Sequence, residues 1–142
     1  MTYLDTGCFV KLYYPEPDSA KVVAAIQGKP VCYSPLHELE FVNALQLKVF
    51  FKGATAAQVT AARALVEADL KSGVLVSGDG AWKDIVQEAV KLAEQHTDKL
   101  GCRSLDILHC AAAKVLAATE FVSTDGRQKK LAAAMGLNLV AI

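Results

Sequence analysis

The sequence has no excess of charge of either sign, because 15 Lys and Arg side chains balance 15 Asp and Glu side chains. A net charge of zero excludes a protein that binds nucleic acid by bulk positive charge alone. No apolar run approaches the roughly 20 residues that a membrane-spanning helix needs. No leader with a charged start, an apolar stretch and a cleavage site is visible either. We therefore expect a cytoplasmic protein that does not associate with a membrane.

Cysteine is sparse and shows no pairing motif. The four cysteines, Cys8, Cys32, Cys102 and Cys110, form no CxxC pair and have no metal-ligand spacing. We expect reduced and mostly buried thiols. Repeats, low-complexity stretches and linkers rich in Pro, Gly or Ser are absent as well. A chain of 142 residues, 53% of them hydrophobic, predicts a single compact domain over residues 1–142.

The sequence alternates short, mostly β-branched runs with helical segments. The expected strands are residues 1–4, 31–33, 74–76, 121–123 and 137–140. The expected helices are residues 6–14, 20–27, 36–51, 56–71, 82–96, 104–118 and 126–135. Strands separated by helices pair in parallel through crossovers, and strands covered on both faces are uniformly apolar. The predicted fold class is α/β, a three-layer α/β/α arrangement around a short central parallel sheet of four to five strands.

Two acidic residues follow predicted strands. Asp5 comes directly after the first strand, and Asp125 comes two residues after the strand at 121–123 and before a helix. Residues just past the carboxyl ends of parallel strands line the ligand crevice of an open sheet, so these two acids can face each other. Each Asp can equally cap the helix that follows it. For either residue alone, the two interpretations are equally favoured.

A third acid, Asp106, lies in the helix expected over residues 104–118, for which Ser104 is the expected cap. This helix has almost no polar face, which is typical of a buried helix. His109 lies three residues further on, and we expect it to pack and hydrogen-bond beside Asp106. The helix dipole alone favours an Asp in the first turn. An acid in so apolar a helix nevertheless needs a partner, and a cation is the obvious one.

Two glutamates, Glu38 and Glu40, lie in the helix expected over residues 36–51. The expected core-facing side carries Leu36, Leu39, Val42, Leu47 and Phe50, and is widened by Phe41 and Leu45. Glu40 lies near that apolar stripe, whereas Glu38 lies nearer the solvent side. Periodicity alone therefore favours Glu40 only slightly.

Together, Asp5, Glu40, Asp106 and Asp125 can form a cluster of three or four carboxylates. Such a cluster cannot stay fully ionised without a counter-charge. Oxygen ligands without Cys or an obligatory His select Mg²⁺ or Mn²⁺ over zinc. One or two such ions can activate water and stabilise the leaving oxygen in phosphodiester cleavage. The carboxylates therefore favour a nuclease.

The segments around these acids resemble those of the PIN-domain ribonucleases, specifically the VapC-type toxins of bacterial toxin–antitoxin pairs. YLDTGCFVKLYYPEP resembles the family's start, in which an Asp ends the first strand and a hydroxyl residue follows it. ELEFVNAL resembles the second motif and selects Glu40 over Glu38. RSLDILHCAAA resembles the third motif, and FVSTDGRQKKLAAAMGL resembles the last. The four motifs occur in the right order over essentially the whole chain.

The resemblance implies a PIN-like fold and a Mg²⁺- or Mn²⁺-dependent endoribonuclease. The implied metal ligands are Asp5, Glu40, Asp106 and Asp125, with Thr6, Asn43 and Thr124 as supporting polar groups. The implied partners are an RNA substrate, a second copy of the chain in a homodimer, and a cognate antitoxin that inserts a peptide near the acidic groove. Lys11, six residues after Asp5, is a candidate phosphate contact.

Two other functions stay open at the level of sequence. One is a PIN-like binding or scaffold module whose acid cluster no longer supports catalysis, although the presence of all four acids favours the enzyme. The other is a phosphatase or phosphotransfer protein of a different α/β fold. The DxD motif of haloacid-type phosphatases is absent, because Asp5 is followed by Thr6 and Gly7. The glycine-rich stretch at 77–80 lacks a phosphate-loop Lys, which predicts an ordinary turn.

Overall fold

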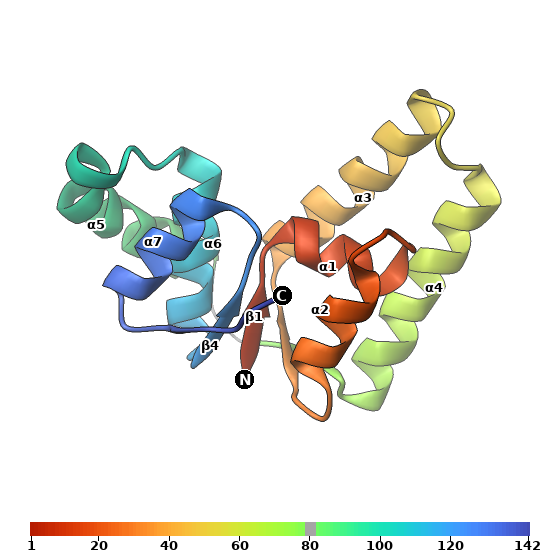
Figure 1. Cartoon of the computed structure of the whole chain (residues 1–142), viewed down its shortest axis with the longest axis horizontal. Coiled ribbons are helices and arrows are strands. Elements are labelled where there is room, and N and C mark those ends of the chain that lie inside the picture. The colour runs from red at the N-terminus through yellow and green to blue at the C-terminus, as the bar shows by residue number, and fades with distance from the viewer. Residues whose placement is uncertain (79–81) are drawn as a thin grey trace.

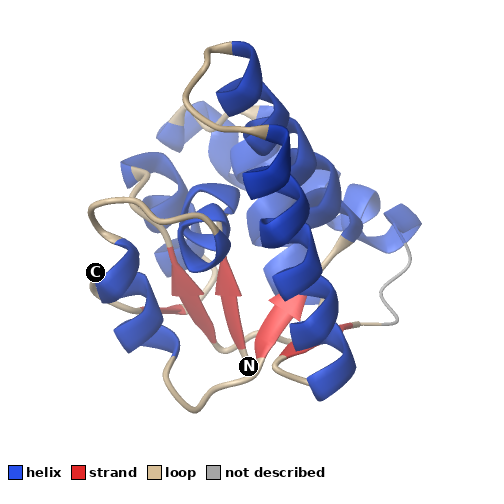
Figure 2. Cartoon of the chain, turned by 90° about the vertical axis from the view of Figure 1, so that its right-hand side faces the viewer, coloured by secondary structure: helices blue, strands red, loops and turns tan. Residues whose placement is uncertain are grey.

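The computed structural model describes residues 1–78 and 82–142, and it has a five-stranded parallel sheet at its centre (Figure 2). The strands are β1 (Thr2–Leu4), β2 (Val31–Tyr33), β3 (Leu75–Ser77), β4 (Glu120–Val122) and β5 (Asn138–Leu139). Their order is β3-β2-β1-β4-β5, and each neighbouring pair is parallel. The α/β class and the predicted parallel sheet are therefore confirmed. The turn expected at 77–80 includes Asp79 and Gly80, which lie outside the described residues.

Helices cover both faces of the sheet and complete the three layers. They are α1 (Thr6–Tyr13), α2 (Ser19–Ile26), α3 (Pro35–Phe50), α4 (Ala56–Ser72), α5 (Trp82–Leu100), α6 (Ser104–Val115) and α7 (Gly126–Ala134). Figure 1 shows α1 to α4 on one side of β1 and α5 to α7 on the other. In the described part of the chain, no helix combines the length and the apolar character needed to cross a membrane.

The side chains of the central strands alternate between two cores. Tyr3 and Phe121 belong to the core formed with α5, α6 and α7, whereas Leu4 and Val122 belong to the core formed with α1 to α4. Because neighbouring residues of one strand serve opposite cores, both of the last two residues of β1 and of β4 are apolar, while Thr2 and Glu120 at the start of these strands hydrogen-bond to each other (2.7 Å). The four cysteines are buried and unpaired, as expected.

The ends of the helices follow from local capping groups. The Thr55 hydroxyl accepts a hydrogen bond from the Gln58 backbone N–H (3.2 Å), and the Gln58 side chain accepts one from the Thr55 N–H (2.8 Å). Helix α6 begins differently from our expectation, because its N-cap residue is Arg103 and not Ser104. The Asp106 carboxylate accepts a hydrogen bond from the Arg103 backbone N–H (3.0 Å), which fixes the start of α6.

The buried face of α3 also differs from the expected one. Leu39, Leu47 and Phe50 were expected in the core, but they are 68%, 46% and 75% exposed. The buried side chains of α3 are Leu36, His37, Phe41 and Leu45. Apolar residues occur around the whole circumference of this helix, so spacing alone does not select a face. The packing of Phe41 against Phe9 of α1, with ring centroids 5.4 Å apart, shows which side is covered.

The order of the strands reverses at the β1–β4 pair. The connections from β1 lead to β2 and β3 on one side, whereas β4 is followed by β5 on the other side. Ligands of open parallel sheets bind at such a switch point, outside the carboxyl ends of the strands. Leu4 pairs in register with Val122, so Asp5 and Ser123 leave the sheet at the same edge.

Candidate functional site

Four acidic side chains line one pocket of about 410 Å³ beyond the carboxyl ends of β1 and β4. They are Asp5 before α1, Glu40 in α3, Asp106 in α6 and Asp125 before α7. The structure thus brings together the four acids that the sequence singled out. A larger cavity of about 810 Å³ beside α2 has no carboxylate in its lining. The chemistry of the lining, rather than size, makes the acidic pocket the candidate site.

Asp106 is 1% exposed and is held mainly by Arg103. The Arg103 guanidinium donates to Asp106 Oδ2 through Nε (3.0 Å) and to Oδ1 through Nη2 (3.1 Å). Gln128 Nε2 adds a bond to Oδ1 (3.3 Å). Burial by itself raises the pKa of Asp106, but the hydrogen bonds from Arg103 and Gln128 outweigh it and hold the pKa below its usual value. Asp106 is therefore a buried carboxylate that stays ionised.

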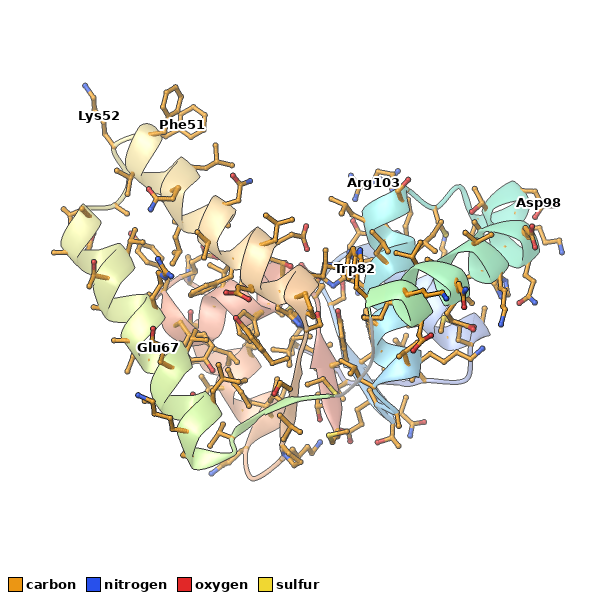
Figure 3. All side chains as sticks on the ribbon, turned by 180° about the vertical axis from the view of Figure 1, so that it is seen from behind. Phe51, Lys52, Glu67, Trp82, Asp98 and Arg103 are labelled. Carbon is orange, nitrogen blue, oxygen red and sulfur yellow. The ribbon has the colours of Figure 1, made fainter. Side chains whose placement is uncertain are left out.

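Arg103 also reaches a second acid of the pocket. Its Nη2 lies 3.2 Å from Asp125 Oδ2, so one guanidinium bridges α6 and the start of α7. Figure 3 shows Arg103 at the N-terminal end of α6. Arg103 was missed at the level of sequence. Its position three residues before Asp106, in the spacing of a helix cap, was the signal that could have identified it.

Ser123 links the two acids that follow strands. Its hydroxyl donates to Asp5 Oδ2 and accepts a hydrogen bond from the Asp125 backbone N–H (2.9 Å). The other Asp5 oxygen, Oδ1, accepts from the Cys8 N–H (2.7 Å), and Asp125 Oδ1 accepts from the N–H groups of the first turn of α7. Both aspartates therefore cap a helix and line the pocket at once, so the two interpretations of these residues do not exclude each other.

Glu40 is held by a short network of buried and half-buried groups. Its Oε2 accepts a hydrogen bond from Thr6 Oγ1 (2.6 Å) and lies 2.7 Å from His109 Nε2, while His109 Nδ1 lies 3.0 Å from the Tyr3 hydroxyl. His109 Nε2 also lies 3.2 Å from Thr6 Oγ1, so the ring contacts Tyr3, Thr6 and Glu40. Burial raises the pKa of Glu40, but the bonds from His109 and Thr6 outweigh it and lower the pKa overall. His109 therefore orients Glu40, and not Asp106 as we expected.

Three of the other residues considered do not reach the pocket. Glu38 is exposed on α3, so the structure separates it from Glu40. Asn43 is also exposed, and it is absent from the lining of the acidic pocket. Thr124 lines a different cavity, of about 420 Å³, beside the C-terminal residues. The hydroxyl that reaches Asp5 belongs instead to Ser123, which sequence reasoning missed because the resemblance rests on the TD pair that follows it.

Lys11 lies in a neighbouring apolar pocket of about 510 Å³ between α1 and α3. This pocket shares Thr6 and Gly7 with the acidic one, and Leu47 and Phe51 are also part of its lining. Lys11, the candidate phosphate contact, therefore lines a pocket next to the acidic one and is not part of the acidic lining.

The sequence model of the PIN domain matches residues 2–134 of this chain. The chain belongs to the PIN domain family. Members of this family are nucleases, which agrees with a pocket lined by carboxylates at the switch point of the sheet. Among curated proteins, none matches the sequence of this PIN domain.

Two solved structures are similar to this PIN domain over nearly their full length. One is FitAcB from Neisseria gonorrhoeae, with 14% sequence identity and a TM-score of 0.61 over 99% of this chain and 97% of that chain. The other is VapBC2 from Rickettsia felis bound to a DNA fragment from their promoter. It has 17% identity and a TM-score of 0.65 over 98% of this chain and 97% of that chain. At these identities the likeness shows the fold, and it places this PIN domain in the same α/β architecture.

The acids of this PIN domain suit an oxygen-preferring cation in type and in number. Four carboxylates face one guanidinium in the pocket lining, which leaves an excess of negative charge that a divalent cation would balance. In residues 1–78 and 82–142, however, no three His, Cys, Asp or Glu side chains are gathered as a metal-binding group. Arg103 occupies oxygens of Asp106 and Asp125 that such a group would use. The four carboxylates are suitable ligands for a metal ion. In this structure, however, Asp106 and Asp125 form ion pairs with Arg103 instead.

Proposed function

We propose that this PIN domain is a Mg²⁺- or Mn²⁺-dependent endoribonuclease and the toxin of a toxin–antitoxin pair. One observation carries the proposal. Asp5, Glu40, Asp106 and Asp125 come from four separate segments and line a single pocket at the switch point of the sheet. A structural role for each acid alone would not require them to share a pocket.

The residues of the chain divide the work of such a site between them. Asp5, Glu40, Asp106 and Asp125 would hold the cation. When bound, the ion would supply Lewis-acid polarisation of the phosphodiester. Thr6 and His109 orient the Glu40 carboxylate, and the Ser123 hydroxyl fixes Asp5 relative to the Asp125 backbone. These hydrogen bonds hold the acids in place before the substrate arrives, which is how supporting groups tune a metal site.

An antitoxin peptide is the partner that we propose for the apolar pocket between α1 and α3. This pocket adjoins the acidic one and exposes large apolar groups, since Phe51 is 74% exposed and Leu47 is 46% exposed. A peptide bound there would lie across the entrance used by RNA. The similar FitAcB and VapBC2 structures are complexes with antitoxin partners, which supports a partner protein for this chain as well. We also propose a homodimer, because α3 exposes Leu39 and Phe50 in addition.

The test combines metal binding with RNA cleavage. Asp5→Asn and Asp106→Asn should each abolish Mn²⁺ binding in calorimetry and lower the cleavage of a mixed RNA substrate by at least about 100-fold, because each removes a charged ligand. Glu40→Gln should act in the same direction. Glu38→Gln is the matched control, since it makes the same change two residues away on the exposed side of α3. Normal cleavage by both Asp variants would refute the site, and EDTA should abolish wild-type cleavage.

A catalytically inactive binding module is the second candidate. It is favoured by the degree to which the carboxylates already have protein donors, since both oxygens of Asp5, Asp106 and Asp125 accept hydrogen bonds. The same titration separates the two functions. Wild-type protein that is folded and free of antitoxin, but does not bind Mn²⁺, would favour the binding module.

A further inference from the structure

The Arg103 side chain holds the position in the acidic pocket that a cation would take. Its Nε and Nη2 donate to Asp106, and Nη2 also donates to Asp125, while the Arg103 backbone N–H donates to Asp106 as well. Among the described residues, no other Lys or Arg side chain forms an ion pair with an acid of this pocket. A single guanidinium therefore supplies the positive charge that the lining has.

Arg103 and its two partners differ in how much they can move. The Asp106 side chain is 1% exposed and the Asp125 side chain 29% exposed, whereas the Arg103 side chain is 59% exposed. Arg103 is also the N-cap residue and stands outside the regular turns of α6. The carboxylates are thus anchored in the fold, and the guanidinium reaches them from the solvent side and can swing away without unfolding the helix.

We propose that Arg103 is a built-in competitor of the metal ion, which neutralises Asp106 and Asp125 in the metal-free protein and must leave them before a divalent cation can bind. The proposal rests on the proposed function, because it assumes that these carboxylates are metal ligands. Asp106 Oδ1 and Oδ2 and Asp125 Oδ2 all accept hydrogen bonds from the guanidinium. A cation held by both acids would compete with the guanidinium for these oxygens.

The competition has a physical role in the metal-free protein. A buried carboxylate without a partner is costly, and charge-assisted bonds from a forked guanidinium remove that cost. Arg103 therefore stabilises the metal-free fold and, by the same contacts, weakens the binding of the metal. Removing it is expected to shift these two properties in opposite directions, which a merely structural ion pair would not do.

The experiment is a calorimetric Mn²⁺ titration of wild-type protein and of Arg103→Gln, read together with thermal melting. We expect Arg103→Gln to bind Mn²⁺ about tenfold more tightly, since its binding no longer requires a charge-assisted pair to be broken. Without metal the melting temperature of this variant should be lower than that of wild type. At saturating Mn²⁺ the difference should shrink or change sign, because tighter binding stabilises the folded state more.

Two further variants separate competition from a general effect of charge. Arg127→Gln removes a positive charge from the first turn of α7, and among the described residues the Arg127 side chain forms no ion pair, so its Mn²⁺ affinity should stay within about twofold of wild type. Arg103→Lys keeps the charge but loses the fork, and should lie between wild type and Arg103→Gln. It also keeps the test valid if Arg103→Gln does not fold.

The outcomes distinguish this inference from the function on which it rests. Equal affinities in wild type and in the Arg103 variants, or weaker binding in the variants, would overturn the competition while leaving the metal site intact. Equal gains in Arg103→Gln and Arg127→Gln would overturn it too, because bulk charge would then explain both. If neither wild type nor any variant binds Mn²⁺, the proposed metal site itself fails, and the competition fails with it.

Discussion

Among single residues, Asp106 and Glu40 depend most clearly on their surroundings. Each is a pocket carboxylate whose burial raises its pKa and whose hydrogen-bond donors lower it by more, Arg103 for Asp106 and His109 for Glu40. Because the folded-state pKa is lowered, the folded state binds these protons less readily than the unfolded state does. The resulting stability is present above the usual pKa of each group and is lost as the pH falls through the lowered one.

This linkage predicts that Asp106 contributes to the loss of folding stability at low pH. As the pH falls below 3.8, the usual pKa of an Asp, wild-type protein should lose free energy of unfolding more steeply than Asp106→Asn. The measurement is a set of chemical denaturation curves at neutral pH and at several values below 3.8. Asp98→Asn on α5, which is exposed, should follow the wild-type curve. Parallel pH profiles for Asp106→Asn and wild type would contradict the assignment.

For His37, in contrast to Asp106 and Glu40, burial outweighs the hydrogen bonds in setting the pKa. Its Nε2 lies 2.7 Å from the Leu4 carbonyl oxygen, and its Nδ1 accepts from the Ser34 backbone N–H (3.1 Å). Burial lowers the pKa of His37 to about 3, so this ring stays neutral over the physiological range. The ring links α3 to the end of β1. This contact positions α3 so that Glu40, one turn after His37, lies within hydrogen-bond distance of Thr6.

At the scale of the elements, α3 has two apolar sides with different roles. One side, with Phe41 and Leu45, packs into the core. The other exposes Leu39, Leu47 and Phe50. The buried side orients Glu40 toward the pocket, and the exposed side is the surface that we propose for protein partners.

The two sides of α3 can be told apart by truncation. Phe41→Ala should lower the free energy of unfolding by about 3–5 kcal/mol, because Phe41 is 2% exposed and its removal leaves a cavity. Phe50→Ala should change it by less than about 0.5 kcal/mol in the monomer, because Phe50 is already 75% exposed. Urea denaturation at a concentration where the protein is monomeric measures both. A large loss for Phe50→Ala with a small one for Phe41→Ala would reverse the assignment of the faces.

At the scale of the whole molecule, the charge distribution does not provide the broad positive surface that is typical of nucleic-acid-binding proteins. The chain has no net charge, and its candidate site is strongly acidic. The RNA binding that we propose would therefore depend on a few local cations rather than on a broad positive face. For the proposed RNA substrate, Lys11, which lines the pocket next to the acids, is the candidate phosphate contact.

The salt dependence of RNA binding tests this view. In an Asp5→Asn background, which prevents cleavage, Lys11→Ala should reduce the slope of log affinity against log salt by about 0.7, the value for one phosphate contact with a single strand. Lys71→Ala, an exposed residue in the last turn of α4, is the control and should leave the slope unchanged. The same slope for Lys11→Ala and its background would show that Lys11 does not contact the RNA.

Local sequence was sufficient to predict the elements and the class of the fold. Hydrophobic periodicity and capping act within a few residues, so the five strands, the helix capped by Thr55 and the parallel sheet could be read without a structure. The segments around Asp5, Glu40, Asp106 and Asp125 also marked these acids in the sequence, and their positions at strand ends indicated a shared edge for two of them.

Only the tertiary structure decided how these pieces meet. The Arg103–Asp125 ion pair spans 22 residues and the Glu40–His109 contact spans 69, so neither follows from periodicity. The buried face of α3 is determined by its packing against α1, where Phe9 contacts Phe41. The link from Ser123 to Asp5 depends on the register of β1 and β4. Sequence determines the local conformation because neighbouring residues control it. The partners of a side chain across the pocket are determined by the crossover connections that bring distant segments together.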